Sequence, residues 1–321
     1  MSPRDLQLDP AVLRWLKRID EHSATLPDLR HPGTPSGRLA AARLSDLLAL
    51  EFTADEAPEV RIDEISLPGP AGPLRVRRYR PPADAGALPT QLFLHGGGFI
   101  HGTVDELLND RLCARRARSS ELQVLSLDYR LAPEDRFPAG VEDAVAAIGE
   151  LAANPAQHGV DPERLGIGGN SAGASIAAGA AIVLRDRGGP ALRHQLLEVP
   201  PMALPPVGES ARLFAEGFGL GQDQALMTAY LGPGPVPPLA SPVDLPDLSG
   251  LPDALIMVAE YDPLRDSGLA YAERLRQAGV PTTTVVGTGH LHGTPGLTAA
   301  WAGARRWQDE QAAALSEAYH Q

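Results

Sequence analysis

Short apolar segments alternate with helical patterns along most of the chain, and this alternation constrains the fold more than any other feature. We expect buried strands at residues 91–94, 122–127, 164–169, 254–259 and 282–286. Helical patterns follow at residues 140–153, 172–187, 266–278 and 297–318. Strands that alternate with helices form a mostly parallel sheet covered on both faces, so the predicted fold class is α/β.

Three further segments frame this alternating core. Residues 61–67 and 74–79 alternate around a turn rich in proline and glycine, which predicts an antiparallel pair at a sheet edge. Helical spacing within residues 9–50 leads us to interpret residues 1–55 as a helical cap arm. Residues 200–252 are rich in proline and glycine, carry Phe214 and Tyr230, and lack a strand pattern. We interpret them as a lid insertion over the strand ends, with a plain surface loop as the alternative. Residues 56–199 and 253–321 then form a single catalytic core.

Composition excludes several classes of protein. The 321 residues are 43% hydrophobic and 21% charged, which suits a globular chain with a sizeable core. A net charge of −12 disfavours nucleic acid and anionic membrane surfaces as partners. Cys113 is the only cysteine, so no internal disulfide can form, and we interpret it as a packing residue. Residues 1–5 precede no apolar segment of signal-peptide type, and no apolar stretch is long enough to span a bilayer, so we expect a cytoplasmic protein.

The segment Gly169-Asn170-Ser171-Ala172-Gly173 matches the pattern G-x-S-x-G between a predicted strand and a predicted helix. A sharp turn at that junction projects the serine hydroxyl above the sheet, and the small neighbours keep the turn from clashing. The start of the helix also offers the N–H group of Ala172 to a developing oxyanion. A serine that merely caps an ordinary helix is the alternative.

A second glycine-rich segment, His95-Gly96-Gly97-Gly98-Phe99, directly follows a predicted strand. Glycines let the backbone approach a ligand closely and turn its N–H groups inward. We assign Gly97 and Gly98, together with Ala172, as oxyanion donors. Gly96 is a weaker candidate for this role. His95 is interpreted as a brace for the loop. A phosphate-binding loop is disfavoured because no Lys-Ser/Thr pair follows.

These motifs, together with two more, resemble the hormone-sensitive-lipase-like esterases of the α/β-hydrolase superfamily. The further motifs are the segments 128–134 (DYRLAPE) and 260–266 (EYDPLRD). The resemblance covers nearly the whole chain. It implies an α/β-hydrolase fold and a serine carboxylesterase that cleaves small carboxylic esters of short to medium acyl chain. It implies no metal and no cofactor, and it makes a homodimer paired through the sheet edge the default.

The order Ser…Asp…His that this fold requires leads to the other two catalytic residues. The family motif falls on Asp262, just beyond a predicted strand, whereas Glu260 and Asp266 remain alternatives and Asp266 is more simply a helix N-cap. The family's H-G-F pattern matches His292-Gly293 and leaves His290 as a minor alternative. Asp128 and Arg130 are interpreted as a structural charged pair.

Three positions depart from the family pattern. Thr294 stands where an aromatic residue is usual and is expected to widen or polarise the site. Asn170 replaces the usual aspartate before the serine. The segment 198–201 (EVPP) differs from the sequence that the family usually has at the end of this strand, so the resemblance does not predict which residues line the acyl pocket. The expected substrate contacts are Phe99, Asn170, Phe214 and Thr294.

Other activities occur on the same scaffold. Acyl transfer to an alcohol or amine and elimination by a lyase use the same base and oxyanion donors, so both remain alternatives. A receptor that binds a ligand without catalysis is the least favoured interpretation, because the receptor relatives lack the triad histidine and this chain has His292.

Overall fold

The computed structural model describes residues 6–57, 59–82, 86–215 and 224–321. These residues build a sheet of eight strands in the order β1-β2-β4-β3-β5-β6-β7-β8. The strands are β1 (Arg61–Gly69), β2 (Gly72–Arg80), β3 (Leu88–Leu94), β4 (Gln123–Leu127), β5 (Val160–Asn170), β6 (His194–Glu198), β7 (Asp253–Tyr261) and β8 (Thr282–Leu291).

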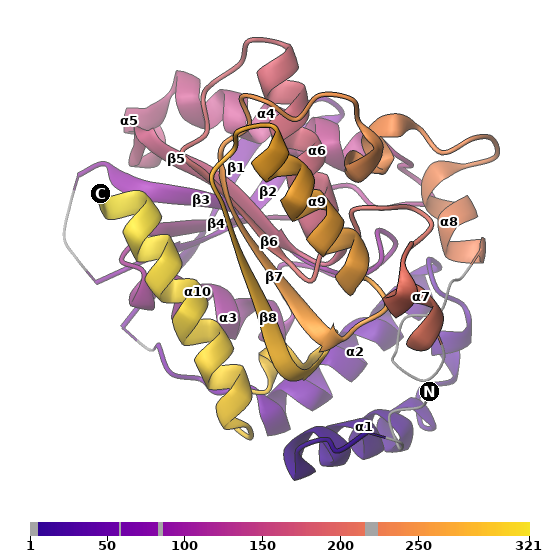
Figure 1. Ribbon diagram of the computed structural model, residues 1–321. Coiled ribbons are helices and arrows are strands. Elements are labelled where there is room, and N and C mark those ends of the chain that lie inside the picture. Colours follow the sequence, from indigo (N-terminus) through magenta and orange to yellow (C-terminus); the bar gives the residue numbers. More distant parts are fainter. Residues whose placement is uncertain (1–5, 58, 83–85, 216–223) are drawn as a thin grey trace.

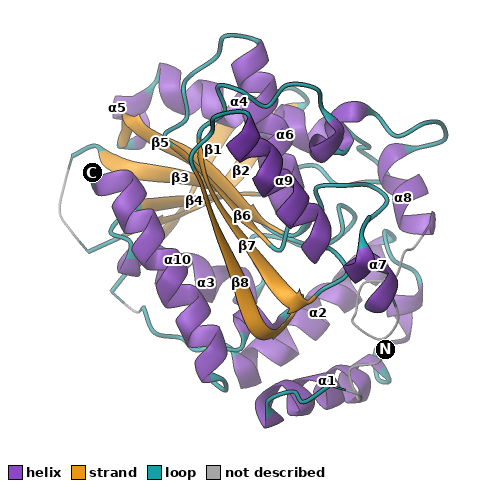
Figure 2. Ribbon diagram, in the orientation of Figure 1, coloured by secondary structure: helices purple, strands orange, loops and turns teal. Residues whose placement is uncertain are grey.

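The direction of the strands confirms the predicted fold class. Each neighbouring pair from β4 to β8 in the sheet order is parallel, whereas β1 and β2 form an antiparallel pair at the edge (Figure 2). The central strands β4 and β6 are buried along their whole length, polar residues included, as expected of strands covered by helices on both faces. All the parallel strands therefore end at one edge of the sheet, where ligands bind in open α/β folds.

Helices cover both faces of the sheet, with α3 and α10 on one face and α4, α6 and α9 on the other (Figure 1). The helices are α1 (Pro10–Ser23), η2 (Pro27–Arg30), α2 (Pro35–Phe52), α3 (Leu107–Ser119), α4 (Ala139–Ala153), α5 (Pro155–His158), α6 (Ala172–Asp186), α7 (Glu209–Leu213), α8 (Gln224–Leu231), η3 (Pro238–Ala240), η4 (Pro242–Asp244), α9 (Arg265–Gln277), η5 (Thr294–Gly296) and α10 (Ala302–His320), where η marks a 3₁₀ helix. None of the helices in the described residues is both long and apolar enough to cross a membrane.

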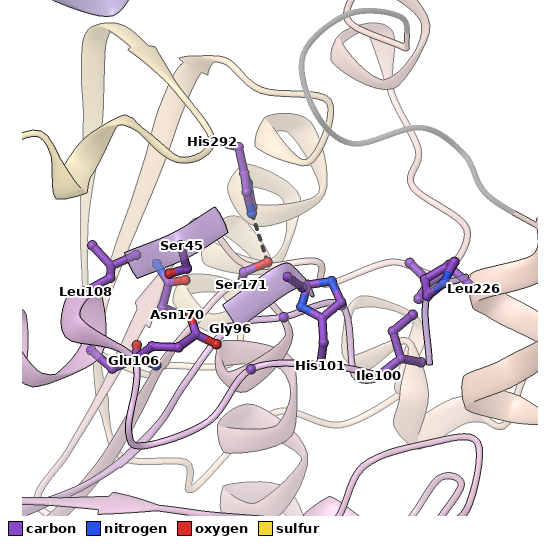
Figure 3. Close-up of a pocket in the computed structure, with 16 residues that line it drawn as sticks. Ser45, Gly96, Ile100, His101, Glu106, Leu108, Asn170, Ser171, Leu226 and His292 are labelled. Atoms are coloured by element: carbon purple, nitrogen blue, oxygen red, sulfur yellow. Dashed lines mark hydrogen bonds between the residues drawn. The ribbon is translucent and has the colours of Figure 1, made fainter. Parts of the chain in front are cut away.

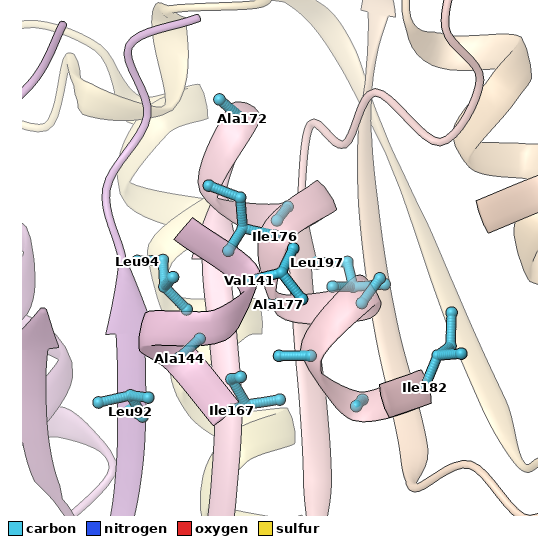
Figure 4. Packing of buried hydrophobic residues seen from close by; sticks show 14 of the residues in the cluster. Leu92, Leu94, Val141, Ala144, Ile167, Ala172, Ile176, Ala177, Ile182 and Leu197 are labelled. Atoms are coloured by element: carbon cyan, nitrogen blue, oxygen red, sulfur yellow. The ribbon is translucent and has the colours of Figure 1, made fainter. Parts of the chain in front are cut away.

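The main hydrophobic core lies between α6, α4 and the central strands (Figure 4). Ile176 and Ala177 of α6 pack towards Leu94 of β3 and Ile167 of β5, and all four side chains are buried. Small residues at most buried positions of α6 let the helix approach the sheet closely. This tight packing holds the start of α6 rigidly at the carboxyl ends of the strands.

Two groups of helices lie outside the layers that cover the sheet. Helices α1 and α2 pack together beyond the carboxyl ends of the strands (Figure 1). The described parts of residues 200–252 contain short helices and no strand, in agreement with the absence of a strand pattern there. Residues 216–223 of the predicted lid lie outside the described residues.

Some elements differ from the sequence-based prediction. Helix α3 and strand β6 were not predicted with bounds, because α3 is rich in arginine and β6 (HQLLE) has only two apolar residues. Strand β8 continues to Leu291 instead of ending at 286, and α10 begins at Ala302 instead of near 297. The late start of α10 has a tertiary cause. Thr298 accepts a hydrogen bond from the Ala54 N–H group, and the Ala299 N–H group donates to Phe52, so these residues are tied to the end of α2.

Candidate active site

Ser171 forms the junction between β5 and α6 with a left-handed backbone, at φ 53° and ψ −121°. A non-glycine residue with positive φ is strained and persists only where its surroundings hold it. The flanking glycines make this turn possible. A Cβ atom on Gly169 would lie 2.3 Å from the carbonyl carbon of Gly173, and one on Gly173 would lie 2.1 Å from the Leu94 oxygen. The elbow predicted from G-x-S-x-G is therefore present.

Three polar side chains from separate loops meet at this elbow. The Oγ atom of Ser171 lies 2.8 Å from Nε2 of His292, and Nδ1 of His292 lies 2.8 Å from Oδ2 of Asp262. Asp262 is 1% exposed, and its other oxygen accepts the N–H group of Leu264 at 2.9 Å. The buried carboxylate therefore holds the imidazole with Nε2 facing the hydroxyl, which is the arrangement that lets a histidine accept a serine proton.

The alternative acids and base occupy other positions. Glu260 accepts the Gly289 N–H group at 2.7 Å. Asp266 is not the N-cap of α9, contrary to the expectation, because Leu264 holds that position. Asp266 instead accepts the N–H group of Ser210 at 2.8 Å, near the start of α7.

His290 is buried 4.3 Å from the ring of Trp301 and 4.8 Å from the ring of Trp307, and burial lowers its pKa to about 4. Its Nδ1 atom lies 2.9 Å from the Thr294 hydroxyl. The structure thus brings His292, and not His290, to the serine.

The glycine loop lies directly beside Ser171. Gly97 and Gly98 have φ values of 129° and 59°, and both line the same cleft as the serine. A Cβ atom on Gly97 would lie 1.9 Å from the His101 oxygen, so only glycine fits this position. Ala172 is the first residue of α6, where backbone N–H groups have no partner within the helix. The three predicted oxyanion donors are therefore close to the serine.

His95 supports the loop from below. Its Nδ1 atom lies 2.7 Å from the Gly96 oxygen, and its ring stacks on Tyr129 with 4.4 Å between centroids. The Tyr129 hydroxyl donates to the His95 oxygen at 2.8 Å. Burial lowers the pKa of His95 to about 4, so the ring is neutral and its Nδ1–H group can donate to Gly96. These contacts agree with the structural interpretation of His95.

The neighbouring charges of the DYRLAPE segment pair with other elements and not with each other. Arg130 binds both oxygens of Asp143, at 2.9 and 3.0 Å from Nε, and Asp128 lies 3.7 Å from Arg75. The expected structural role agrees with these contacts, whereas the expected mutual pair does not form.

Of the four expected substrate contacts, only Asn170 lines the cleft. Phe99 stacks on Tyr230 with 3.8 Å between centroids, and Phe214 packs against Tyr261. Thr294 is fully buried, and its hydroxyl donates to the Leu291 oxygen and accepts the Leu291 N–H group. Phe99, Phe214 and Thr294 therefore lie outside the lining of this cleft, because each contributes to packing or to the turn that carries His292.

Sequence reasoning missed the role of Glu198, which lies behind the elbow at 1% exposure. Its carboxylate accepts Trp307 Nε1 at 2.6 Å and Asn170 Nδ2 at 3.3 Å, and it lies 3.8 Å from Arg116. Its backbone oxygen accepts the Ser171 N–H group at 2.8 Å. The available signal was a glutamate directly after the two leucines of β6, because a charge in a buried strand is tolerated only when it is paired.

The cleft above the serine has a volume of about 420 Å³ and is lined by residues from several segments distant along the chain (Figure 3). Its lining includes Ser45 of α2, Leu226 of α8 and Glu106, which lies just before α3. An adjoining apolar cavity of about 320 Å³ shares Ser45 and His101 with the cleft and extends between α1 and α2. The described residues contain no group of three or more His, Cys, Asp or Glu side chains placed to hold a metal ion.

The sequence and fold match known proteins along most of the chain. A family model described as alpha/beta hydrolase fold matches residues 91–295. Esterase LipI of Mycobacterium tuberculosis is 40% identical over 249 residues, which cover 74% of this chain and 76% of LipI. Carboxylesterase NlhH of the same organism is 38% identical over 261 residues, which cover 75% of this chain and 77% of NlhH.

Among solved structures, an ester hydrolase from the metagenome of Lake Arreo superposes with a TM-score of 0.88 at 35% identity, covering 98% of this chain and 100% of that one. A Pyrobaculum calidifontis esterase gives a TM-score of 0.84 at 33% identity, covering 97% and 99%. The chain therefore belongs to the α/β-hydrolase fold family, as one of its hormone-sensitive-lipase-like esterases.

Proposed function

We propose that the protein is a serine carboxylesterase with Ser171 as nucleophile, His292 as general base and acid, and Asp262 as the orienting carboxylate. The observation that carries this proposal is the continuous relay of hydrogen bonds, with 2.8 Å from Ser171 to His292 and 2.8 Å from His292 to Asp262. Esterase relatives at 38–40% identity support the same reaction class.

Acylation follows from this geometry. Nε2 of His292 accepts the Ser171 proton as Oγ attacks the ester carbonyl carbon, and Asp262 stabilises the resulting imidazolium. The N–H groups of Gly97, Gly98 and Ala172 hold the negative oxygen of the tetrahedral intermediate. The imidazolium then protonates the leaving alcohol, and the acyl group remains bonded to Ser171.

Deacylation repeats the sequence with water. His292 takes a proton from the water molecule as it attacks the acyl-enzyme, and the same three N–H groups again hold the oxyanion. Collapse of the intermediate breaks the bond to Oγ, which recovers its proton from His292. The products are a carboxylic acid and an alcohol, and no cofactor takes part in these steps.

We infer that the substrates are small esters with short to medium acyl chains. The apolar cavity of about 320 Å³ adjoins the cleft and is lined by aliphatic and aromatic side chains of α1 and α2, including Trp15, Leu44, Leu48 and Phe52. We place the acyl chain of the substrate in this cavity, which has room for a short to medium chain. Leu48→Ala, which enlarges the cavity, should move the optimum toward longer chains.

Labelling by a fluorophosphonate, combined with a chain-length series of p-nitrophenyl esters, tests the proposal. The wild type should label at Ser171, and turnover should be highest for short to medium chains. Ser171→Ala should lose both labelling and turnover. Ser175→Ala is the matched control, because Ser175 is a buried serine one turn further along α6 and lies outside the cleft lining.

Each outcome separates the candidate activities. Absence of labelling and turnover in the wild type would overturn the esterase assignment. Strong labelling with negligible hydrolysis would favour acyl transfer or elimination. A maximum rate on emulsified long-chain triglyceride would overturn the inferred chain length.

We further propose that residues 1–55 act as a cap arm and residues 200–252 as a lid. Support comes from the cleft itself, since Ser45 of α2 and Leu226 of α8 lie on its wall. The core of residues 56–199 and 253–321 supplies the serine, histidine and carboxylate.

A homodimer paired through β8 also remains a proposal. β8 is the last strand in the sheet order, and Val286 on this strand is 47% exposed. Light scattering of the wild type and of Val286→Lys tests it. A dimeric wild type and a monomeric variant are expected, and a monomeric wild type would contradict the proposal.

A further inference from the structure

Glu106 projects a carboxyl group into the cleft without performing the usual task of its position. It occupies the N-cap of α3, where a side chain commonly accepts a hydrogen bond from the helix start, yet its side chain makes no such bond. The Leu107 N–H group is bound instead by Asp46 Oδ1 of α2 at 2.8 Å. The Glu106 side chain is therefore free to face the cleft that contains Ser171 and His292 (Figure 3).

The surroundings of Glu106 leave its charge uncompensated. None of the described residues that line the cleft is a lysine or arginine. The Ser45 side chain and the Thr103 backbone hydrogen-bond the carboxyl group, and Asp46 lies nearby with the same charge. Burial raises the pKa of Glu106 to about 7.

Two further titratable side chains, those of His101 and His292, face the same cleft. The pKa of His101 is lowered by burial, which favours its neutral form. His292 is held by Asp262 at 2.8 Å. The neighbouring Asp105 turns away, because both its oxygens bind Arg75.

We propose that Glu106 determines specificity by receiving a positively charged group on the alcohol part of the substrate ester. The inference rests on the proposed esterase function and names the substrate class of that site. A carboxylate in a partly buried cleft without a protein cation is stabilised most by a cation that the ligand brings. The adjoining apolar cavity does not include Glu106 in its lining, so the acyl chain and the cation occupy different branches.

The net charge of the chain also favours positively charged substrates. At −12 the protein attracts cationic esters and repels those that carry a carboxylate. This long-range attraction is screened by salt, whereas a local pair at Glu106 is screened less. The two effects can therefore be separated by ionic strength.

A pair of isosteric esters tests the proposal. Butyrylcholine keeps its positive charge at every pH, and 3,3-dimethylbutyl butyrate has the same shape without the charge. The measured quantity is the ratio of their kcat/KM values, in which the protonation of His292 cancels. In the wild type this ratio should rise about tenfold between about pH 6 and pH 8.5, as Glu106 ionises.

Three variants test whether the pH dependence of this ratio comes from Glu106. Glu106→Gln, close to isosteric, should remove the rise of the ratio with pH, and Glu106→Asp should retain part of it because the charge remains. Asp105→Asn is the matched control, since it removes a neighbouring exposed carboxylate outside the cleft lining, and it should leave the ratio as in the wild type.

The outcomes distinguish this inference from the proposed function. If the wild type hydrolyses neither these two esters nor any p-nitrophenyl ester of the chain-length series, the esterase proposal fails, whereas turnover of the p-nitrophenyl esters alone would overturn only the role of Glu106. If it hydrolyses both with a ratio that does not depend on pH, or if Glu106→Gln keeps the rise, the role of Glu106 is overturned. The wild-type pH profile gives this answer even if a variant does not fold.

Discussion

The side-chain amide of Asn170 donates to the Glu198 carboxylate across 3.3 Å, one residue before the serine of the elbow. Family members resembling this chain commonly carry an aspartate at the position of Asn170. Here the negative charge stands on the neighbouring strand β6, where Trp307 also binds it. In this chain the carboxylate behind the nucleophile therefore belongs to β6, and Asn170 of β5 is its hydrogen-bond donor.

Asn170→Asp should destabilise the protein, because it would place two carboxylates within hydrogen-bonding distance in a site with little water. We expect the free energy of unfolding to fall by about 1–3 kcal/mol at pH 7, measured by urea denaturation. The double variant Asn170→Asp/Glu198→Gln should recover much of this loss, since it restores a single charge. An Asn170→Asp protein as stable as the wild type would contradict this account.

Asp262→Asn should lower kcat by about 10⁴-fold, the size of effect seen when a triad aspartate is replaced in serine proteases. The amide would favour the wrong tautomer of His292, whose Nδ1–H group now points to Asp262. Asp266→Asn is the matched control, because Asp266 lies in the same segment and binds Ser210 and Arg265. Steady-state kinetics on p-nitrophenyl butyrate measures both, and an equal loss in the two variants would argue against Asp262.

Gly97→Ala should lower kcat/KM by at least about 10²-fold, because the methyl group would displace the loop that donates to the oxyanion. The space for it is taken by the His101 oxygen, 1.9 Å from the Cβ position.

Gly149→Ala in α4 is the control for this substitution, since its Cβ atom would meet nothing within 4 Å. That variant should keep its activity and gain roughly 0.5–1 kcal/mol of stability in thermal or urea unfolding. A Gly97→Ala enzyme with normal kinetics would exclude the loop from the reaction.

Acidification should destabilise the fold through its buried histidines. Burial lowers the pKa values of His95, His194 and His290 to about 4 each, below the ordinary value near 6.5. The unfolded chain therefore binds more protons than the folded chain between these limits. Their contribution to stability is full above pH 6.5 and is lost as the pH falls toward 4, by about 1.4 kcal/mol per pH unit for each histidine.

The variant His194→Gln measures how much one of these buried histidines contributes to the pH dependence of stability. His194 lies at the start of β6, at the end of the strand opposite the candidate site. Urea denaturation between pH 7 and pH 5 should show a slope of stability against pH that is smaller by about one proton. Activity at pH 7 should stay near the wild-type value, and an unchanged slope would contradict the assignment of a buried neutral histidine.

The elements of the site were predictable because each carries a local pattern. Ser171 lies between a strand and a helix flanked by small residues, and His292 and Asp262 lie at or just beyond strand ends. Parallel strands end at one edge, so three distant segments can be expected to meet there. The H-G pattern already favoured His292 over His290, and in the structure both lie near the end of β8 but only His292 faces the serine.

The substrate contacts were the weakest prediction because side-chain direction depends on packing. Phe99 and Phe214 are aromatic residues of the kind that often contact a ligand, yet both rings are buried against tyrosines that are distant along the chain. Thr294 was expected to face the site, yet its hydroxyl satisfies backbone groups of the turn. Glu106 was not predicted as a contact, yet its carboxyl group lies in the cleft. The reason is that Asp46 of α2 accepts the N–H group at the start of α3 in its place.

The sequence by itself determined the fold class, the elbow at Ser171, the glycine loop and the order of the catalytic residues, because these depend on backbone geometry and local spacing. Tertiary structure alone decided where the buried charge of Glu198 is paired and which side chains line the cleft. Those outcomes depend on contacts between segments distant along the chain, such as α2 with α3 and β6 with α10. Hydrogen bonds of this kind select among side chains that local sequence treats as equivalent.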